Sequence, residues 1–400
     1  MFLFFLIFLA MAGLVSSYIS LRVLSQFSIG RIWKIAATFG ILLIIFVPPL
    51  NILLRRSGID HNGVRLLIGA GYMGFGFLSF VFTFVVFRDL VWLPPRIIHK
   101  MRAFFRPSTS ARMAPDAIDD LSRRGFLVKA TSCGIVAAAA LSTGVGVAEA
   151  SRIPEVKEVT VPIPHLPRGF EGFRIVQITD LHVNPTFQRP SVEGIVKVVN
   201  DLSAHVVALT GDLVDGSVDQ LSNEVAPLER ISSTHGKFFV TGNHEYYSGA
   251  LDWIEQLKRL GFTVLLNEHC IITHDHGRML LAGVTDYRGG GDGLPSHRSD
   301  PHKALTGSPP ADIKVLLAHQ PKSIFDAAQA GYDLQISGHT HGGQFFPWLL
   351  LVGLSQPYIS GLHKHKNTQI YVSRGTGYWG PPIRVGAPSE ITLLRLTSAE

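Results

Sequence analysis

Cysteine is scarce in this sequence, and so are acidic residues in its first part. The 400 residues include only Cys133 and Cys270, too few for a disulfide framework or a cysteine-rich zinc site. Residues 1–150 carry 15 Lys and Arg but 6 Asp and Glu, whereas residues 151–400 carry 21 and 24. The excess positive charge therefore belongs to the N-terminal part and does not describe a basic nucleic-acid-binding domain, so no nucleic-acid partner is expected.

Three stretches have no charged residue at all, namely Met1–Leu21, Ile35–Leu54 and Leu66–Phe87. About 20 apolar residues span the hydrocarbon core of a bilayer as a helix. These runs therefore predict three transmembrane helices within residues 1–90. Pro48 and Pro49 predict a kink in the second helix.

A fourth charge-free segment, Ala130–Ala148, follows Arg123, Arg124 and Lys129. This pattern is typical of a twin-arginine export signal that ends in a small-residue cleavage site, here 148–150. A fourth transmembrane helix with basic flanks explains the segment equally well. Residues 130–150 are therefore predicted to be one or the other.

The basic residues of the segment before this crossing predict the topology. They are Arg88, Arg96, Lys100, Arg102, Arg106, Arg112, Arg123 and Arg124. Positive residues stay cytoplasmic, so residues 91–129 are predicted to be a cytoplasmic linker and residues 151–400 to lie outside a bacterial inner membrane. If residues 130–148 do not cross, the C-terminal domain is cytoplasmic instead.

The last 250 residues have a different pattern, in which short β-rich runs alternate with helical ones. Predicted strands are Arg174–Thr179, Val206–Thr210, Lys237–Thr241, Met279–Val284, Ile313–Ala318, Leu334–Ser337, Gln369–Ser373 and Ile391–Leu396. Predicted helices are Ser191–Leu202, Leu251–Leu260 and Ser323–Ala330. The alternation predicts an α/β domain with largely parallel sheets, whose ligand site lies beyond the carboxyl ends of the strands.

Five of these strands run directly into residues that bind metals. The motifs are Asp180-Leu181-His182, Gly211-Asp212-Leu213-Val214-Asp215, Gly242-Asn243-His244-Glu245, His319-Gln320 and Gly338-His339-Thr340-His341-Gly342-Gly343-Gln344. Burying such groups is costly unless something pairs with them. Carboxylate, amide oxygen and imidazole together suit Mn, Fe or Zn better than Ca, so the set predicts a divalent-metal site.

In this order, the five motifs resemble the signature of the calcineurin-like metallophosphoesterase superfamily over roughly residues 170–345. The Gly-Gly-Gln after His341 and the 373–384 tail are similar to a bacterial membrane-associated branch. That branch includes twin-arginine-exported phosphoesterases and enzymes that resemble the UDP-2,3-diacylglucosamine pyrophosphatase of lipid A biosynthesis. The resemblance implies a four-layer α/β/β/α sandwich, preceded here by the transmembrane region, and a dinuclear metal site.

The resemblance also assigns roles to the motif residues. One cation would be held by Asp180, His182, Asp212 and His341, and the other by Asp212, Asn243, His319 and His339. Two such cations can clamp a phosphate and activate water. His244 would be the general acid, or a transition-state stabiliser, at the leaving oxygen. Asp215 and Glu245 would orient histidines or backbone, unless they are ordinary turn or surface carboxylates.

The substrate is less well specified by the sequence. Arg374 and Arg384 are candidates to contact phosphate, or else form surface ion pairs, and the Gly-rich loop 288–298 could border a pocket. The apolar run 345–352 either packs into the core or brings the site to the bilayer for a lipid-linked phosphate or phospholipid. The function expected is hydrolysis of a phosphoester or pyrophosphate. The alternatives are a phosphatase or phosphodiesterase of soluble substrates and a non-catalytic membrane scaffold.

Overall fold

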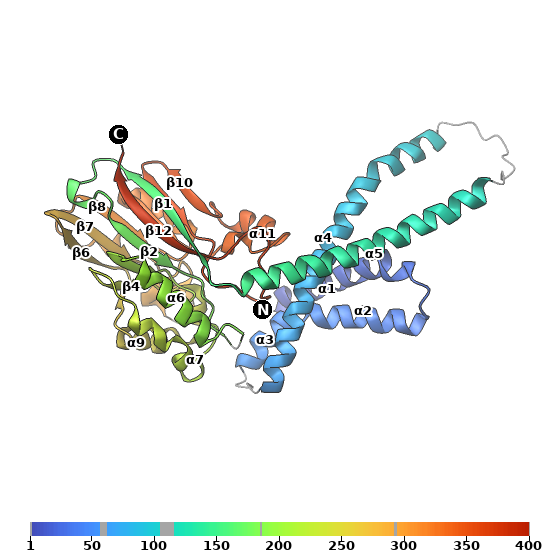
Figure 1. Ribbon diagram of the computed structural model, residues 1–400, viewed down its shortest axis with the longest axis horizontal. Coiled ribbons are helices and arrows are strands. Elements are labelled where there is room, and N and C mark those ends of the chain that lie inside the picture. The colour runs from blue at the N-terminus through green and yellow to red at the C-terminus, as the bar shows by residue number, and fades with distance from the viewer. Residues whose placement is uncertain (1, 57–61, 105–115, 185, 292–293, 400) are drawn as a thin grey trace. The chain divides into compact units, whose positions relative to one another are not determined.

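The computed structural model describes residues 2–56, 62–104, 116–184, 186–291 and 294–399 (Figure 1). The chain forms two compact units, Met1–Gly146 and Val147–Glu400. Arg106 and Arg112 of the predicted basic linker lie outside the described residues.

Unit 1 is helical. Its helices are α1 (Phe2–Arg22), α2 (Arg31–Ile45), α3 (Val47–Arg56), α4 (Asn62–Phe104) and α5 (Asp116–Ala150), the last of which continues into unit 2. Among the described residues, Leu6–Gln26, Gly63–Leu93 and Gly125–Ala150 are long and apolar enough to cross a membrane. The predicted second span is divided at Phe46 into α2 and α3, just before Pro48, because proline cannot continue the hydrogen-bond ladder of a helix interior.

Polar contacts tie the end of α1 to α4. The Arg22 Nε atom lies 2.7 Å from Asp89 Oδ2, and the Tyr18 hydroxyl donates to the same carboxylate at 2.8 Å. Charged groups in an apolar region are stable when they pair in this way. The turn after α1 and the residues around Asp89 therefore lie at the same end of the bundle.

Unit 2 contains two six-stranded sheets. The first has the order β1-β12-β2-β3-β4-β5, formed by Glu155–Ile163, Glu390–Ser398, Arg174–Ile178, Val206–Leu209, Lys237–Phe239 and Thr263–Val264. The second has the order β10-β11-β9-β8-β7-β6, formed by Gly361–His365, Thr368–Val372, Leu334–Ser337, Ile313–Leu317, Gly277–Gly283 and Glu268–His274. Strands β2 to β5 are parallel, as are β7, β8, β9 and β11, so the predicted mixed α/β fold with largely parallel pairing is confirmed.

Apolar clusters hold these elements together. One cluster joins inward-facing residues of both sheets, such as Ile175 and Ile336. A second packs the first sheet against the helices α6 (Arg189–Asp201), α7 (Val218–Val225) and α9 (Ala250–Arg259). A third includes Ala327 of α10 (Ile324–Ala330) and strand β8. Strands buried on both faces read as continuous apolar runs, which explains the pattern of Val206–Leu209.

Candidate metal centre

Strand ends from both sheets contribute residues to one site. Asp180 and His182 follow β2, Asp212 follows β3, Asn243 and His244 begin α8 (Asn243–Ser248) after β4, His319 follows β8, and His339 and His341 follow β9. Because β2, β3 and β4 are parallel neighbours, as are β8 and β9, their carboxyl ends meet at one edge of each sheet.

The seven predicted ligand positions include two clusters of closely spaced ligand atoms. Asp180, His182 and His341 form one group and Asp212, His319 and His339 another, and the ligand atoms within each lie within 4.8 Å of one another. A single oxygen of Asp212 faces both clusters, since Oδ2 lies 3.1 Å from His319 Nε2 and 3.7 Å from His182 Nε2. This oxygen is therefore close to ligand atoms of both clusters.

Hydrogen bonds on the far side of two imidazole rings fix their orientation. His319 donates from Nδ1 to the Thr210 carbonyl at 2.8 Å, and His182 Nδ1 lies 3.1 Å from Asp215 Oδ1. A neutral ring that donates from Nδ1 presents the Nε2 lone pair. Nε2 of both rings faces the clusters, and in the neutral form it would offer its lone pair to a cation, as expected of metal-bound histidines.

The amide oxygen of Asn243 indicates whether the site suits a metal ion. Asn243 Oδ1 is buried and has no hydrogen-bond partner among the described residues. Leaving a buried carbonyl oxygen without a partner costs about 1–3 kcal/mol. An amide oxygen is a suitable ligand for Mn, Fe or Zn beside carboxylate and imidazole, so a cation bound there would satisfy it.

The backbone is strained at this site. Asp180, His182, Asp212, His339 and His341 all have positive φ angles, between 48° and 72°. Side chains other than glycine adopt this region at an energetic cost, and such strain gathers at functional sites. Two glycines also admit the carboxylates, because a Cβ on Gly338 would lie 2.2 Å from Asp180 Oδ2 and one on Gly242 2.2 Å from Asp212 Oδ1.

Burial and neighbouring charges shift the pKa values of several side chains in the two clusters. Burial raises the pKa of the Asp180 carboxyl. Burial also acts to raise the pKa of Asp212, but His319 and His244 hold it well below its usual range. The pKa of His341 is well below its ordinary value, because the ring is buried and His182 lies beside it. The site therefore keeps an ionised Asp212 carboxylate and a neutral His341 ring, which are the forms that bind a cation.

Asp215 and Glu245 each hold neighbouring groups in place. The Asp215 Oδ1 atom lies 2.6 Å from His244 Nδ1 as well as 3.1 Å from His182 Nδ1. Glu245 is fully buried and accepts hydrogen bonds from the backbone N–H groups of Gly242, Leu213 and Asp212, at 2.6, 2.8 and 3.0 Å. Glu245 is thus no surface carboxylate, and both positions fit the orienting role predicted for them.

Arg384 lies in a different environment from the one that its predicted phosphate contact requires. The guanidinium is buried and donates to the carbonyls of Gly377, Arg374, Ala387 and His341. Its Nη2 atom also lies 3.0 Å from His341 Nδ1. These contacts engage the guanidinium fully, so it braces the loop behind His341 instead of facing a substrate. Arg374 is half-buried and supplies one of those carbonyls.

Asp286 was not singled out from the sequence although it belongs to the same region. It is buried two residues after Val284, accepts from Gln320 Nε2 at 2.9 Å, and its charge influences the titration of His319. The signal was present, because the predicted strand 279–284 also runs into a carboxylate. The 288–298 loop that follows packs near the site through His297, whose Nδ1 lies 2.9 Å from the Tyr246 hydroxyl. Residues 292–293 of this loop lie outside the described residues.

Comparisons with known proteins agree with this geometry. The family model for calcineurin-like phosphoesterases matches residues 173–343. The metallophosphoesterase YkuE of Bacillus subtilis is 30% identical over 293 residues, which are 70% of this chain and 98% of that one. A Danio rerio transmembrane protein with a metallophosphoesterase domain is 37% identical over 263 residues, 64% of this chain and 60% of that one. A Helicobacter pylori metallophosphoesterase is 42% identical, covering 61% and 64%.

Among solved structures, a dimetal phosphatase from Danio rerio is 14% identical, with a TM-score of 0.36 over 55% of this chain and 91% of that one. The chain spans about three fifths of the length of the first relatives that it matches. With its fold and clustered ligands, and with nearly the whole of YkuE matched, the chain belongs to the calcineurin-like metallophosphoesterase family. Members of this family use two divalent cations, and the apolar helices together with the transmembrane relative support membrane association.

Proposed function

We propose that this chain is a membrane-anchored hydrolase of phosphoester or pyrophosphate bonds that works with two divalent cations, Mn, Fe or Zn. The unpartnered Asn243 Oδ1 beside the shared Asp212 carboxylate carries the proposal. Asp180, His182, Asp212 and His341 would hold one cation, and Asp212, Asn243, His319 and His339 the other. When bound, the pair neutralises phosphate charge and supplies the activated water.

Side chains of the protein would orient the acid and protonate the leaving group. His244 is held by Asp215 through Nδ1, so its Nε2 can face the leaving oxygen. Burial acts to lower the pKa of His244, but Asp212 and Asp215 raise it to about 9. These two carboxylates favour the protonated ring, which is the form able to donate a proton to the departing group.

We propose a lipid-linked phosphate of the cell envelope as the substrate, in keeping with the resemblance to the bacterial branch that includes UDP-2,3-diacylglucosamine pyrophosphatase-like enzymes. Helix α11 (Trp348–Ser355) supports this. Phe345 before it is buried, but Leu350, Leu351 and Leu354 are 58%, 54% and 85% exposed. A Cβ on Gly343 would lie 2.5 Å from Leu349 Cα, so α11 adjoins the loop that carries His341. An apolar surface beside the site suits an acyl chain.

We also propose a domain organisation for the membrane anchor and a layer arrangement for the catalytic domain. Residues 1–90 would supply three transmembrane helices, residues 91–129 the cytoplasmic linker and residues 130–150 a further crossing or an export signal, with residues 151–400 catalytic. Only four residues separate α5 from β1, so the link between the two is short. The apolar clusters on either side of and between the two sheets support a four-layer α/β/β/α sandwich.

The test uses the full chain purified in detergent, stripped with a chelator and resupplied with Mn, Fe or Zn. Turnover of a monoester, a diester and a lipid-linked pyrophosphate is measured. We expect metal-dependent turnover of at least one, and a loss of about 10²-fold or more in Asn243→Ala, since a misplaced metal centre misaligns the reacting atoms. Asn223→Ala, on an exposed position of α7, is the control and should keep full activity. Metal-independent turnover, or equal loss in both variants, would contradict the proposal.

A further inference from the structure

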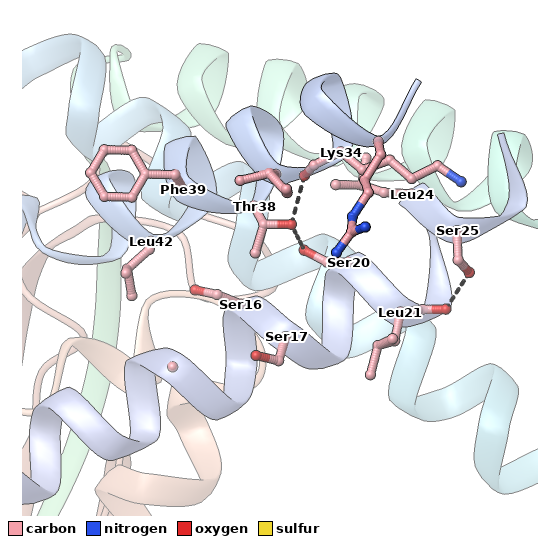
Figure 2. A pocket seen from close by; sticks show the side chains of 13 residues that line it. Ser16, Ser17, Ser20, Leu21, Leu24, Ser25, Lys34, Thr38, Phe39 and Leu42 are labelled. Carbon is pink, nitrogen blue, oxygen red and sulfur yellow. Dashed lines mark hydrogen bonds between the residues drawn. The ribbon is translucent and has the colours of Figure 1, made fainter. Parts of the chain in front are cut away.

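A groove between α1 and α2 in unit 1 is separate from the metal centre. It has a volume of about 470 Å³ and is lined by Ser16, Ser20, Arg31, Lys34, Thr38 and Leu42, with further small and apolar side chains (Figure 2). It extends along α1 from Gly13 to Leu21, about 12 Å of helix, and continues past the end of α1 to Leu24 and Ser25. That length accommodates part of an acyl chain.

The hydroxyl groups along this groove are not all satisfied. Ser25 donates to the Leu21 carbonyl, Thr38 donates to the Lys34 carbonyl, and the Ser20 and Thr38 hydroxyl oxygens lie 2.8 Å apart. Ser16 lies one turn from Ser20 and is only 2% exposed, yet its Oγ has no partner among the described residues. In an apolar segment an unpaired hydroxyl is costly, so a polar atom of a ligand is expected beside it.

Two basic side chains lie at one end of the groove. Arg31 and Lys34 lie in the first turn of α2, and within the described part of the chain neither side chain forms an ion pair or a hydrogen bond. The preceding Gly30 provides no side-chain cap for the helix. Positive side chains are unfavourable at a helix N-terminus, where an anion is favoured. An anionic group bound there would neutralise both cations and the helix end.

The opposite end is lined by Phe39 and Leu42, with the Ser16 hydroxyl beside Leu42 (Figure 2). We propose that the groove binds an anionic membrane lipid, with its phosphate against Arg31 and Lys34, an ester or glycerol oxygen near Ser16, and an acyl chain along Phe39 and Leu42. A second copy of the chain fits less well. Copies inserted in the same orientation would place their Arg31 and Lys34 side chains against like charges.

The experiment is native mass spectrometry of the full chain, released from detergent micelles that contain equal amounts of phosphatidylglycerol and phosphatidylcholine. The wild type should retain one phosphatidylglycerol in preference to phosphatidylcholine, and an excess of inorganic phosphate should not displace it. Displacement by phosphate would mean a simple anion site. A lipid-free dimer would mean that a second copy fills the groove. Either result overturns the proposal.

Variants locate the lipid. Arg31→Gln and Lys34→Gln should each reduce phosphatidylglycerol retention about fivefold, the effect of one basic residue near an anionic headgroup. Ser16→Leu should abolish retention by filling the groove. Lys129→Gln, which removes an exposed cation of α5, should change nothing. Circular dichroism and turnover at the metal centre should match the wild type in all four. A loss in Lys129→Gln equal to that in Arg31→Gln, or unchanged binding in Ser16→Leu, would contradict the assignment.

Discussion

At the scale of single residues, His244 is the side chain proposed to act in catalysis and not as a metal ligand. Its ring is held by Asp215 and flanked by the exposed rings of Tyr247 and Trp379, whose centroids lie 5.3 and 6.0 Å from its own. This places His244 at the mouth of the site with aromatic groups beside it, where a leaving group would depart.

His244→Gln should therefore lower turnover in a way that depends on the leaving group. Phenyl phosphate needs a proton on its departing oxygen, so its kcat should fall about 10²–10⁴-fold. p-Nitrophenyl phosphate leaves readily without one and should lose much less. Steady-state kinetics on the two esters gives the comparison, and His302→Gln, at an exposed position, is the control. Equal losses on both esters would assign His244 to metal binding, a role that its proximity to His182 and Asp212 also allows.

The metal-ligating residue types could be predicted because each follows a strand of recognisable pattern. Parallel strands bring their carboxyl ends together, so order along the chain becomes proximity in space. The environment of Arg384 could not be predicted in this way. Charged side chains are usually exposed, and its burial depends on the carbonyls of Gly377, Arg374 and Ala387, which only the folded loop brings together. Asp286 could have been found by applying the strand-end rule once more.

At the scale of elements, the eight predicted strands correspond to β2, β3, β4, β7, β8, β9, β11 and β12. In the described part of the chain, four further strands were not predicted, namely β1, β5, β6 and β10. β1 alternates along Glu155–Ile163 and carried a readable signal, whereas β5 has only two residues and β10 is largely polar. A short or polar edge strand forms because its neighbour offers backbone partners, which local sequence does not reveal.

Helix α11 leads to a prediction about membrane substrates. The sequence allowed it either to enter the core or to face outward, and the structure leaves its leucines exposed. Replacing both Leu350 and Leu354 with Glu should reduce turnover of a lipid-linked pyrophosphate in vesicles about tenfold or more, because carboxylates resist entry into the apolar layer. Turnover of soluble p-nitrophenyl esters should remain unchanged.

The matched control for this change is Leu251→Glu, at a similarly exposed apolar position on α9. It should affect neither substrate. Equal losses on lipid and soluble substrates in the α11 variant would show that the helix supports the site itself and not the approach of a lipid.

At the scale of the whole molecule, the proposed membrane topology rests on where the basic residues lie. Arg22 contacts Asp89, so the α1–α2 turn lies at the same end of the bundle as Arg88 and Asp89. If that end is cytoplasmic, the crossing by α5 places residues 151–400 outside. Protease added to spheroplasts of a bacterial host should then cleave the C-terminal domain before lysis. Protection of the domain until the cells are lysed would place it in the cytoplasm.

The central claim is that two cations share the Asp212 carboxylate. Elemental analysis of the full chain, purified with manganese or iron supplied, tests it most directly. The wild type should retain about two metal ions per chain. Asp212→Ala, which removes the bridging oxygen, should retain fewer than one while keeping its helix and strand content by circular dichroism. A wild-type chain that binds no stoichiometric metal, or an Asp212→Ala variant that keeps both ions, would contradict the account.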